Sequence, residues 1–304
     1  MKVVALAGGT GSAKLLRGLQ RLPVELTAVV NVGDDFWAYG VYVCPDIDIA
    51  TYSLAGVADP AKGWGIAGDA FTVLERVRGL GAETWFRLGD LDLATSLVRT
   101  QMLHGGATLT QAADRVRRRL GVRSRVLPVT DSDVETRIST PKGELHLQEF
   151  WVREGGRPRV TGVSYVGARR AKVTPQAASA IMAADRIVLC PANPVTSLGP
   201  MLAVTGFPPL LSSSRARVVA LSPMAGGAPY SGPAGKLLRA VGSRPDSVGI
   251  ARLYSKFLDG MLISEHDSAM GPSIESLGIR CAATDTLMKG PRDELRLARE
   301  LLEL

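Results

Sequence analysis

The first 22 residues place an apolar run, a glycine-rich turn and an amphipathic segment one after the other. Residues 2–7 (KVVALA) are apolar without alternation, which is typical of a strand buried on both faces. Residues 8–12 read GGTGS, and residues 12–22 space their leucines along one helical face. A strand that enters a helix through small residues lets backbone N–H groups approach a phosphate. This unit favours a parallel sheet with a ligand crevice at the ends of its strands.

The order of a buried strand followed by a polar loop recurs along the chain. Residues 25–32 are apolar and end at two aspartates, residues 186–200 break into Pro, Asn and Ser, and residues 216–229 break into Gly and Pro. Because the carboxyl ends of parallel strands meet at one edge, these loops can share one crevice. We therefore predict an α/β protein with a Rossmann-like, doubly wound, mostly parallel sheet.

The middle of the chain has a different pattern. Residues 67–125 show the i, i+3, i+4 apolar spacing of helices, and residues 134–152 alternate like two strands around a Thr-Pro-Lys-Gly turn. We predict a Rossmann-like nucleotide-binding core made of residues 1–66 and 160–304, with a helical and hairpin insertion at 67–159.

The charge of the chain is unevenly distributed. Lys and Arg number 36 against 29 Asp and Glu, a net charge of +7, and six arginines lie in the acid-free segment 115–125, so the remainder carries +1. That segment has no interleaved aromatic residues, so we expect a helix end rather than a nucleic-acid surface. Residues 22–61 contain no Lys or Arg. Their acids are Glu25, Asp34, Asp35, Asp46, Asp48 and Asp59.

The cysteines and the hydropathy limit the class of protein further. Cys44, Cys190 and Cys281 are odd in number and lack metal-ligand spacing, so we expect neither a disulfide framework nor a structural zinc site. A reducing cytoplasm is the expected location. No apolar run approaches the 18 residues of a membrane span, so no membrane partner is expected.

The glycine-rich turn supplies the first candidate binding residues. Gly9, Thr10, Gly11 and Ser12 would surround a phosphate at the start of the first helix. They begin a GxGxxG pattern, but Lys14 stands where its last glycine belongs, and no GxxxxGK[ST] is present. An ordinary dinucleotide site and a P-loop are therefore not indicated, and a tight turn without a ligand is the alternative.

Four aspartates, at positions 34, 35, 46 and 48, follow the second strand on the same sheet edge. Buried carboxylates without a nearby cation are costly, and Mg²⁺ that bridges carboxylate and phosphate would neutralise them. We predict a divalent-cation site among these four side chains, with Asp48 as the first candidate. The alternative is that some of these side chains cap helices or turns, and Asp46 after Pro45 is a candidate cap.

Aromatic and cationic residues surround the acidic segment. Trp64, with Phe36 and Trp37 in the preceding stretch, could give a flat surface to an aromatic ligand, although aromatic residues more often belong to the core. Arg87 would suit the polar edge of such a ligand, or it is a solvated residue beside a helix.

Two later loops carry polar groups at strand ends. Asn193, Pro194 and Ser197 could recognise a phosphate, ribose or base, and residues 231–236 (SGPAGK) open another helix with small residues and a cation. Ordinary turn chemistry is the alternative for both.

Together these motifs resemble the 2-phospho-L-lactate transferase family (CofD) of coenzyme F420 biosynthesis, in order along almost the whole chain. The matching pieces are Gly8–Gly11, Asn31–Asp35 with Trp37, Pro45–Asp48, Gly63–Gly65, Arg87–Asp90, Ala94-Thr95, Gln148–Trp151, Asn193-Pro194, Ser197, Gly199-Pro200, Ser222-Pro223, Ser231–Lys236 and Ala283–Met288.

The resemblance implies a metal-dependent transfer of a phospholactyl or phosphoenolpyruvyl group from a guanosine diphosphate-linked donor to a deazaflavin, 7,8-didemethyl-8-hydroxy-5-deazariboflavin, with release of GMP. It implies that Asp48 and Arg87 contact the deazaflavin, and that the 9–12 and 193–197 loops hold the guanosine nucleotide. It also implies that Asp46 or Asp48 binds Mg²⁺ and that homodimers form. Ile49 departs from the threonine often found in relatives, which removes a possible hydroxyl contact. We expect catalysis by positioning and charge neutralisation, with Asp48 as the candidate proton acceptor.

Two other functions share part of these motifs. A nucleotide-sugar-binding regulator of the gluconeogenesis-factor type has a similar glycine turn without turnover, but has no need of an aromatic platform. A sugar nucleotidyltransferase shares Leu6–Gly9 and would use a basic residue such as Lys14, but the later motifs do not fit that class.

Overall fold

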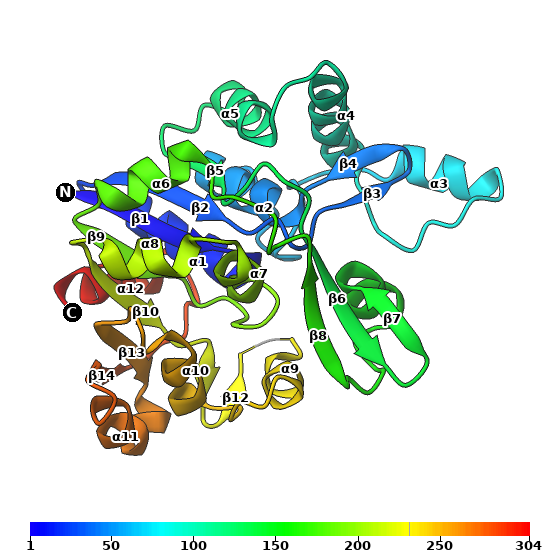
Figure 1. The fold of residues 1–304 in the computed structure, drawn as a ribbon. Helices are drawn as coiled ribbons and strands as arrows, with labels where there is room; N and C mark the ends of the chain where they lie inside the picture. The colour runs from blue at the N-terminus through cyan, green and yellow to red at the C-terminus, as the bar shows by residue number, and fades with distance from the viewer. Residues whose placement is uncertain (231) are drawn as a thin grey trace.

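The computed structural model describes residues 1–230 and 232–304 and is built around one seven-stranded parallel sheet. In spatial order its strands are β14 (Arg280–Thr284), β13 (Gly260–Ser264), β10 (Arg217–Leu221), β9 (Arg186–Leu189), β1 (Lys2–Ala7), β2 (Glu25–Val30) and β5 (Arg125–Pro128). Helices flank the sheet (Figure 1). The predicted Rossmann-like α/β class is confirmed.

The strand order reverses beside β1. From β1 the chain adds β2 and β5 on one side, and then crosses to add β9, β10, β13 and β14 on the other. The carboxyl ends of β1 and β9 therefore lie at a topological switch point, where open α/β sheets bind their ligands. The glycine-rich turn follows β1 and the 191–197 loop follows β9, so the two predicted nucleotide-binding segments meet there.

The helices connect these strands and cover them. Their bounds are α1 (Gly9–Gln20), α2 (Pro45–Ala55), α3 (Thr72–Gly79), α4 (Asp90–His104), α5 (Leu109–Arg119), α6 (Pro175–Met182), α7 (Leu198–Ala203), α8 (Phe207–Ser213), α9 (Ala234–Ala240), α10 (Ser247–Tyr254), α11 (Gly271–Glu275) and α12 (Pro291–Glu303). α1 packs against both α2 and α12. The arginine-rich segment 115–125 spans the end of α5, a turn and the start of β5, and at least Arg118 is well exposed.

Small antiparallel elements lie beyond the carboxyl ends of the central strands (Figure 1). They are a hairpin of β3 (Phe36–Ala38) and β4 (Val41–Val43), a three-stranded sheet of β7 (Gly143–His146), β6 (Glu135–Thr140) and β8 (Gly162–Val166), and a short hairpin of β11 (Met224–Ala225) and β12 (Ala228–Pro229). Residues 67–159 thus hold helices and a hairpin as expected, but they also hold β5, which belongs to the central sheet.

The second strand of the 134–152 hairpin is shorter than the alternation suggests. β7 ends at His146, and residues 149–153 form a π-helical turn. The Glu149 carboxylate accepts a hydrogen bond from the His146 backbone N–H at 2.9 Å, and His146 Nδ1 accepts one from the Gln148 N–H at 3.1 Å. The Glu149 and His146 side chains thus bind backbone N–H groups that a longer strand would pair with its neighbour. The strand therefore stops there.

The apolar core has one large and one small part. The large part fills both faces of the central sheet, and it includes Leu15, Leu16 and Leu19 of α1 as their spacing predicts. The small part consists of Ala38, Val41, Val43 and Leu88, with Phe36, Tyr39, Phe86 and Leu93 packed around them. It attaches the β3–β4 hairpin to the segment that carries Arg87.

Two expectations from composition can be compared with the fold. In the described ranges no helix is long and apolar enough to cross a membrane. The three cysteines are free thiols, and those of Cys44 and Cys190 are buried.

We expect a glycine at the crossing of α1 and α12 to be essential for stability. A Cβ at Gly18 would lie 2.1 Å from the Glu294 carbonyl oxygen, whereas a Cβ at Gly79, near the end of α3, would meet no atom within 4 Å. Gly18→Ala should lower the free energy of unfolding by about 1–3 kcal/mol because the backbones must separate. Gly79→Ala is the matched control and should be neutral or slightly stabilising. Urea unfolding measures both, and equal effects would contradict the close crossing.

Candidate nucleotide and acceptor site

The glycine turn and the 191–197 loop approach too closely for side chains at two positions. A Cβ at Gly8 would lie 2.7 Å from Ser197 Cβ and 2.8 Å from an Asp46 carboxylate oxygen, and a Cβ at Gly11 would lie 2.3 Å from the Pro191 carbonyl oxygen. Gly9 has a φ of +71°, which favours glycine. The glycines are therefore needed to bring these two loops together, and the start of α1 lies between them.

The amide of Asn31 joins three separate segments. Its Nδ2 lies 2.9 Å from Asp34 Oδ1, 2.9 Å from Asp46 Oδ2 and 3.3 Å from the Thr196 carbonyl oxygen, and its Oδ1 accepts from the Gly33 N–H at 2.9 Å. Asn31 is completely buried. Its position directly after β2 was the available sequence signal, yet Asn31 was not among the predicted site residues.

Asp46 faces the glycine turn from the first turn of α2. Its Oδ1 accepts at 2.7 Å from the Gly9 N–H, which is the first of α1, whereas α2 is preceded by Cys44 and has no side-chain cap. Asp46 therefore does not cap its own helix, and its carboxylate satisfies an N–H at the start of α1. Burial raises the pKa of Asp46 from its ordinary value of 3.8 to about 6, against the lowering effect of its bonds to Asn31 and Gly9. Burial and the nearby Asp46 charge also raise the pKa of Asp34.

Asp48 is held by an arginine that sequence reasoning missed. The Arg99 guanidinium of α4, which is completely buried, forms an ion pair with Asp48 Oδ1 and donates to the Tyr42 carbonyl oxygen at 3.1 Å. Burial raises the pKa of Asp48, and the Arg99 charge opposes this rise. The buried face of α4 that carries Arg99 is polar and includes Asp92, Ser96 and Thr100, so apolar spacing gave no signal for it. A buried arginine is expensive without a partner, and Asp48 supplies that partner.

Asp35 is a buried carboxylate without a hydrogen-bond partner among the described residues. Asp35 is 3% exposed, and burial raises the pKa of its carboxyl group. The nearby Cys44 thiol and the Arg99 charge oppose this rise. A buried polar group left in this state costs free energy until a ligand or water reaches it.

The predicted deazaflavin residues Arg87 and Trp64 both contact the ring of Phe71. The Arg87 guanidinium stands 4.5 Å from the centre of the Phe71 ring, and the Trp64 ring packs edgewise on Phe71 with centres 6.4 Å apart. A Cβ at Gly63 would contact Thr10 at 3.6 Å, so this loop packs against the glycine turn. The structure thus brings the acceptor and nucleotide candidates to one edge of the sheet.

Several predicted polar side chains have structural partners. Ser12 Oγ donates to the Gly8 carbonyl at 2.7 Å and Asn193 Oδ1 accepts from the Val195 N–H at 2.9 Å, so both side chains shape their own loops. Pro194 and Ser197 are buried in that second loop. Ser231 lies outside the described residues. Lys236 donates to three carbonyl oxygens, those of Gly156, Arg157 and Pro158, at 2.8, 3.3 and 3.1 Å.

The carboxylates do not form a complete metal cage. No group of three or more His, Cys, Asp or Glu side chains in residues 1–230 and 232–304 is arranged to hold a metal ion. A Mg²⁺ ion in phosphoryl transfer, however, uses one or two carboxylates together with substrate phosphates. Asp46 and Asp34, which share the Asn31 amide beside the glycine turn, suit that mode, whereas Asp48 already has a cationic partner.

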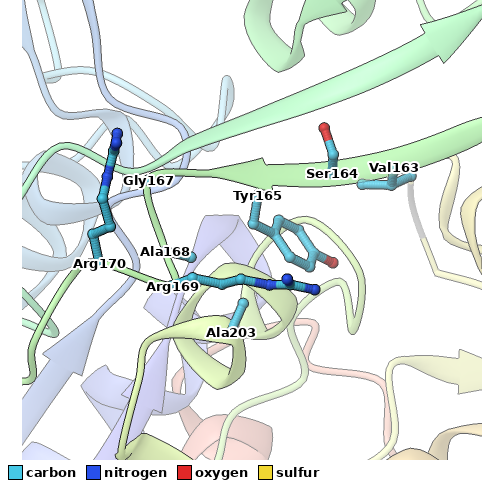
Figure 2. Close-up of a pocket in the computed structure, with 8 residues that line it drawn as sticks. All are labelled: Val163, Ser164, Tyr165, Gly167, Ala168, Arg169, Arg170 and Ala203. Carbon is cyan, nitrogen blue, oxygen red and sulfur yellow. The ribbon is translucent and has the colours of Figure 1, made fainter.

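A large cavity lies elsewhere and contains none of the predicted site residues. It has a volume of about 740 Å³ and is lined by the end of β8 and the following loop. Figure 2 shows its two arginines, Arg169 and Arg170, and the ring of Tyr165. The Tyr165 hydroxyl donates to the Val195 carbonyl at 2.5 Å, so this wall supports the 191–197 loop from behind.

Fold and site together define an α/β protein whose candidate ligand crevice is at the switch point of a parallel sheet. The family model "2-phospho-L-lactate transferase CofD" matches residues 3–276. The chain therefore belongs to this family, and it is a transferase of coenzyme F420 biosynthesis.

Individual relatives agree with this assignment. The chain is 40% identical to "2-phospho-L-lactate transferase" of Methanopyrus kandleri, with 100% of this chain and 97% of the relative covered. It is 39% identical to "Phosphoenolpyruvate transferase" of Streptomyces griseus, with 100% and 98% covered. Among solved structures, protein BH3568 of Bacillus halodurans has a TM-score of 0.67 at 20% identity, with 99% of each chain covered, which shows a shared fold.

Removal of Arg99 should expose the cost of the buried Asp48 charge. Arg99→Met should lower the free energy of unfolding by about 3–5 kcal/mol at pH 8, and by less at a lower pH, because the raised pKa of Asp48 helps its carboxylate to take up a proton. The double variant Asp48→Asn/Arg99→Met should lose much less than the sum of the single variants. Urea unfolding at both pH values checks this, and additive losses would show that the two side chains are not coupled.

The raised pKa of Asp46 should make the folded chain less stable at high pH than at low pH. Ionisation of Asp46 costs the folded state, so its contribution to stability is present below pH 4 and is lost as pH rises through about 6. Asp46→Asn leaves one of the Gly9 and Asn31 donors without an acceptor, so it should be destabilising at pH 4. Because the amide does not ionise, the variant should compare more favourably with wild type at pH 8 than at pH 4, by on the order of 2 kcal/mol. Thermal unfolding across this range without divalent cations tests it, and a loss of stability that is the same at both pH values would contradict the assignment.

Proposed function

We propose that the chain transfers a phospholactyl or phosphoenolpyruvyl group from a guanosine diphosphate-linked acid to 7,8-didemethyl-8-hydroxy-5-deazariboflavin and releases GMP. One observation carries this proposal: the glycine turn, the Asn31–Asp46 pair and the 191–197 loop converge at the switch point, and the Trp64 loop packs against the same turn. The names of the relatives from Methanopyrus and Streptomyces support both forms of the transferred group. They do not favour the regulator or the nucleotidyltransferase.

The donor would bind across the start of α1. Gly9, Thr10, Gly11 and Ser12 line the donor site. Thr10 and Gly11 supply backbone N–H groups that have no intrahelical partner, whereas the Gly9 N–H is bound to Asp46 and the Ser12 hydroxyl shapes the turn. Asn193, Pro194 and Ser197 form the facing loop. The guanosine would lie between the two loops, with its diphosphate toward Asp46.

The acceptor would approach from the aromatic side. Trp64 and Arg87, both exposed and both in contact with Phe71, offer a flat surface and a cation, and Arg87 can bind a polar ring edge. The ribityl hydroxyl of the deazaflavin would then lie near Asp48, whose side chain remains 12% exposed beside Arg99.

The proposed chemistry is an in-line displacement at phosphorus. The hydroxyl oxygen forms a bond to the phosphorus that bears the acid, the bond from that phosphorus to the bridging oxygen breaks, and GMP leaves. Asp48 accepts the hydroxyl proton, and Arg99 fixes the orientation of its carboxylate. Mg²⁺, when bound by Asp46 and Asp34 with the diphosphate, supplies charge neutralisation of the leaving oxygens.

We also propose a cellular location and an oligomeric state for the enzyme. We place the reaction in the cytoplasm, where the three free thiols stay reduced, and expect a homodimer. The substrates are small molecules, and neither nucleic acid nor a membrane takes part.

A direct assay tests the proposed reaction. Purified protein, the deazaflavin, Mg²⁺ and either lactyl- or enolpyruvyl-2-diphospho-5′-guanosine should give GMP and a deazaflavin phosphodiester in equal amounts, and EDTA should stop both. Mass spectrometry distinguishes the two products because they differ by two hydrogens. Arg87→Ala should raise the KM for the deazaflavin at least about tenfold and leave the KM for the donor unchanged.

Two controls make the assay decisive. Arg118→Ala, which removes an exposed arginine of α5, should leave all parameters unchanged. Folded wild-type protein that forms neither product with either donor would refute the transferase reaction. Undiminished turnover in EDTA-treated, metal-free solution would refute the magnesium requirement.

A further inference from the structure

Successive carbonyl groups of the loop after β9 are held by different parts of the chain. The Val195 carbonyl oxygen accepts from the Tyr165 hydroxyl at 2.5 Å, and the Thr196 carbonyl oxygen accepts from the Asn31 amide at 3.3 Å. Asn193 Oδ1 accepts from the N–H groups of the same two loop residues, at 2.9 and 3.3 Å. Tyr165 belongs to β8 of the three-stranded sheet. That sheet therefore binds the backbone of the loop that faces the glycine turn.

The strand beside β8 binds the loop on the other side of the crevice. Thr136 of β6 is the register partner of Tyr165, and its backbone N–H donates to the Gly33 carbonyl oxygen at 2.8 Å. A Cβ at Gly33 would lie 2.7 Å from Thr136 Oγ1 and 2.6 Å from Pro200, so β6 and α7 both pack against this glycine without room for a side chain. One rung of the three-stranded sheet, Thr136 with Tyr165, thus contacts the loops after both β2 and β9.

The hydroxyl end of Tyr165 is tightly enclosed, whereas its ring borders a cavity. A Cβ at Gly199, in the first turn of α7, would lie 2.1 Å from the hydroxyl oxygen. The ring lines the cavity of about 740 Å³ (Figure 2), so part of its surface has no packed neighbour. Burial raises the pKa of the hydroxyl, which therefore keeps the proton that it donates to Val195. The hydrogen bond, more than the packing of the ring, sets the distance between β8 and the loop.

The position of this loop matters at the start of α1. Ser197 follows Val195 by two residues, and a Cβ at Gly8 would lie 2.7 Å from Ser197 Cβ. A shift of the Val195 carbonyl would therefore move Ser197 relative to the glycine turn. A misplacement of about 1 Å that begins far from the reacting atoms can lower a rate by about a hundredfold. A ligand held between the two loops would respond to the loss of one hydrogen bond at Val195.

We infer that Tyr165 is a positioning residue for the guanosine diphosphate-linked donor, and that the Thr136–Tyr165 rung sets the place of the 191–197 loop opposite the glycine turn. The inference rests on the proposed function. Tyr165 acts through the Val195 carbonyl and does not touch the donor. Asn31 ties the same two loops through the core, and the rung ties them through the three-stranded sheet. The acceptor side of the site has no part in this contact.

Separate measurement of donor and acceptor binding tests the role of Tyr165. Isothermal titration calorimetry with GMP measures nucleotide binding to full-length protein, and turnover gives the KM for the donor and for the deazaflavin. Tyr165→Phe leaves the Val195 carbonyl without its donor, so it should weaken GMP binding and raise the donor KM by about fivefold or more. The deazaflavin KM should remain as in wild type, and kcat should change less than the donor KM.

Gly199→Ala tests the same contact from the side of α7. Its methyl group would meet the Tyr165 hydroxyl oxygen, so the hydroxyl or the loop must move. The donor KM should rise and the deazaflavin KM should not, which gives a second test if Tyr165→Phe does not fold. In Tyr165→Phe/Gly199→Ala the rise should be smaller than the product of the two single effects, because the hydrogen bond can be lost only once.

A buried tyrosine whose hydroxyl lacks a partner provides the matched control. Tyr254 of α10 is 2% exposed, and its hydroxyl has no hydrogen-bond partner among the described residues. Tyr254→Phe should therefore leave GMP binding and both KM values unchanged.

The possible failures are distinct. Folded Tyr165→Phe and Gly199→Ala proteins with wild-type GMP binding and donor KM would refute the positioning role and leave the proposed function standing. Equal rises in the KM for donor and acceptor would also refute it, because a general loss of structure predicts that result. Wild-type protein that binds GMP but forms no product would refute the proposed reaction alone, since GMP binding still tests Tyr165. Wild-type protein that does not bind GMP would refute both.

Discussion

The site depends on the amide of Asn31, which ties the end of β2 to the first turn of α2 and to the loop after β9. An amide with two hydrogens and three acceptors nearby has no freedom to rotate. Because its partners come from both sides of the switch point, the strand that carries Asn31 fixes the width of the crevice. The glycines of the first turn fit that width because a Cβ at Gly8 or Gly11 would not.

The buried carboxylates at this edge of the sheet differ in their partners. Burial raises the pKa of all four aspartates, and the Arg99 guanidinium, paired with Asp48, opposes this rise at Asp48 and at Asp35. Burial of unpaired carboxylates lowers the stability of the ligand-free chain and increases the gain when a cation or hydrogen-bond donor arrives. This arrangement exchanges stability for affinity, as binding sites commonly do.

The sequence predicted the parts of the fold that rest on local pattern. The apolar runs before the glycine turn and before residues 191–197 became β1 and β9, and the leucine spacing of α1 became its buried face. β5 was missed because it is a four-residue strand behind an arginine-rich turn, and β14 because its small residues carry little hydropathy. Periodicity also could not show that the π-helical turn at 149–153 replaces a strand.

The roles of site residues were less accessible, because they depend on long-range contacts. Asp46 was expected as a metal ligand or a cap, and only the fold shows its bond to Gly9. The partner of Asp48, Arg99, is 51 positions away in the sequence.

The small core of four buried residues under the β3–β4 hairpin affects how easily the hairpin opens. So few apolar contacts make it a unit that opens at a fraction of the free energy of global unfolding, so its amide hydrogens exchange before those of the central sheet. The β3–β4 hairpin can thus open while β1 and the glycine turn stay folded.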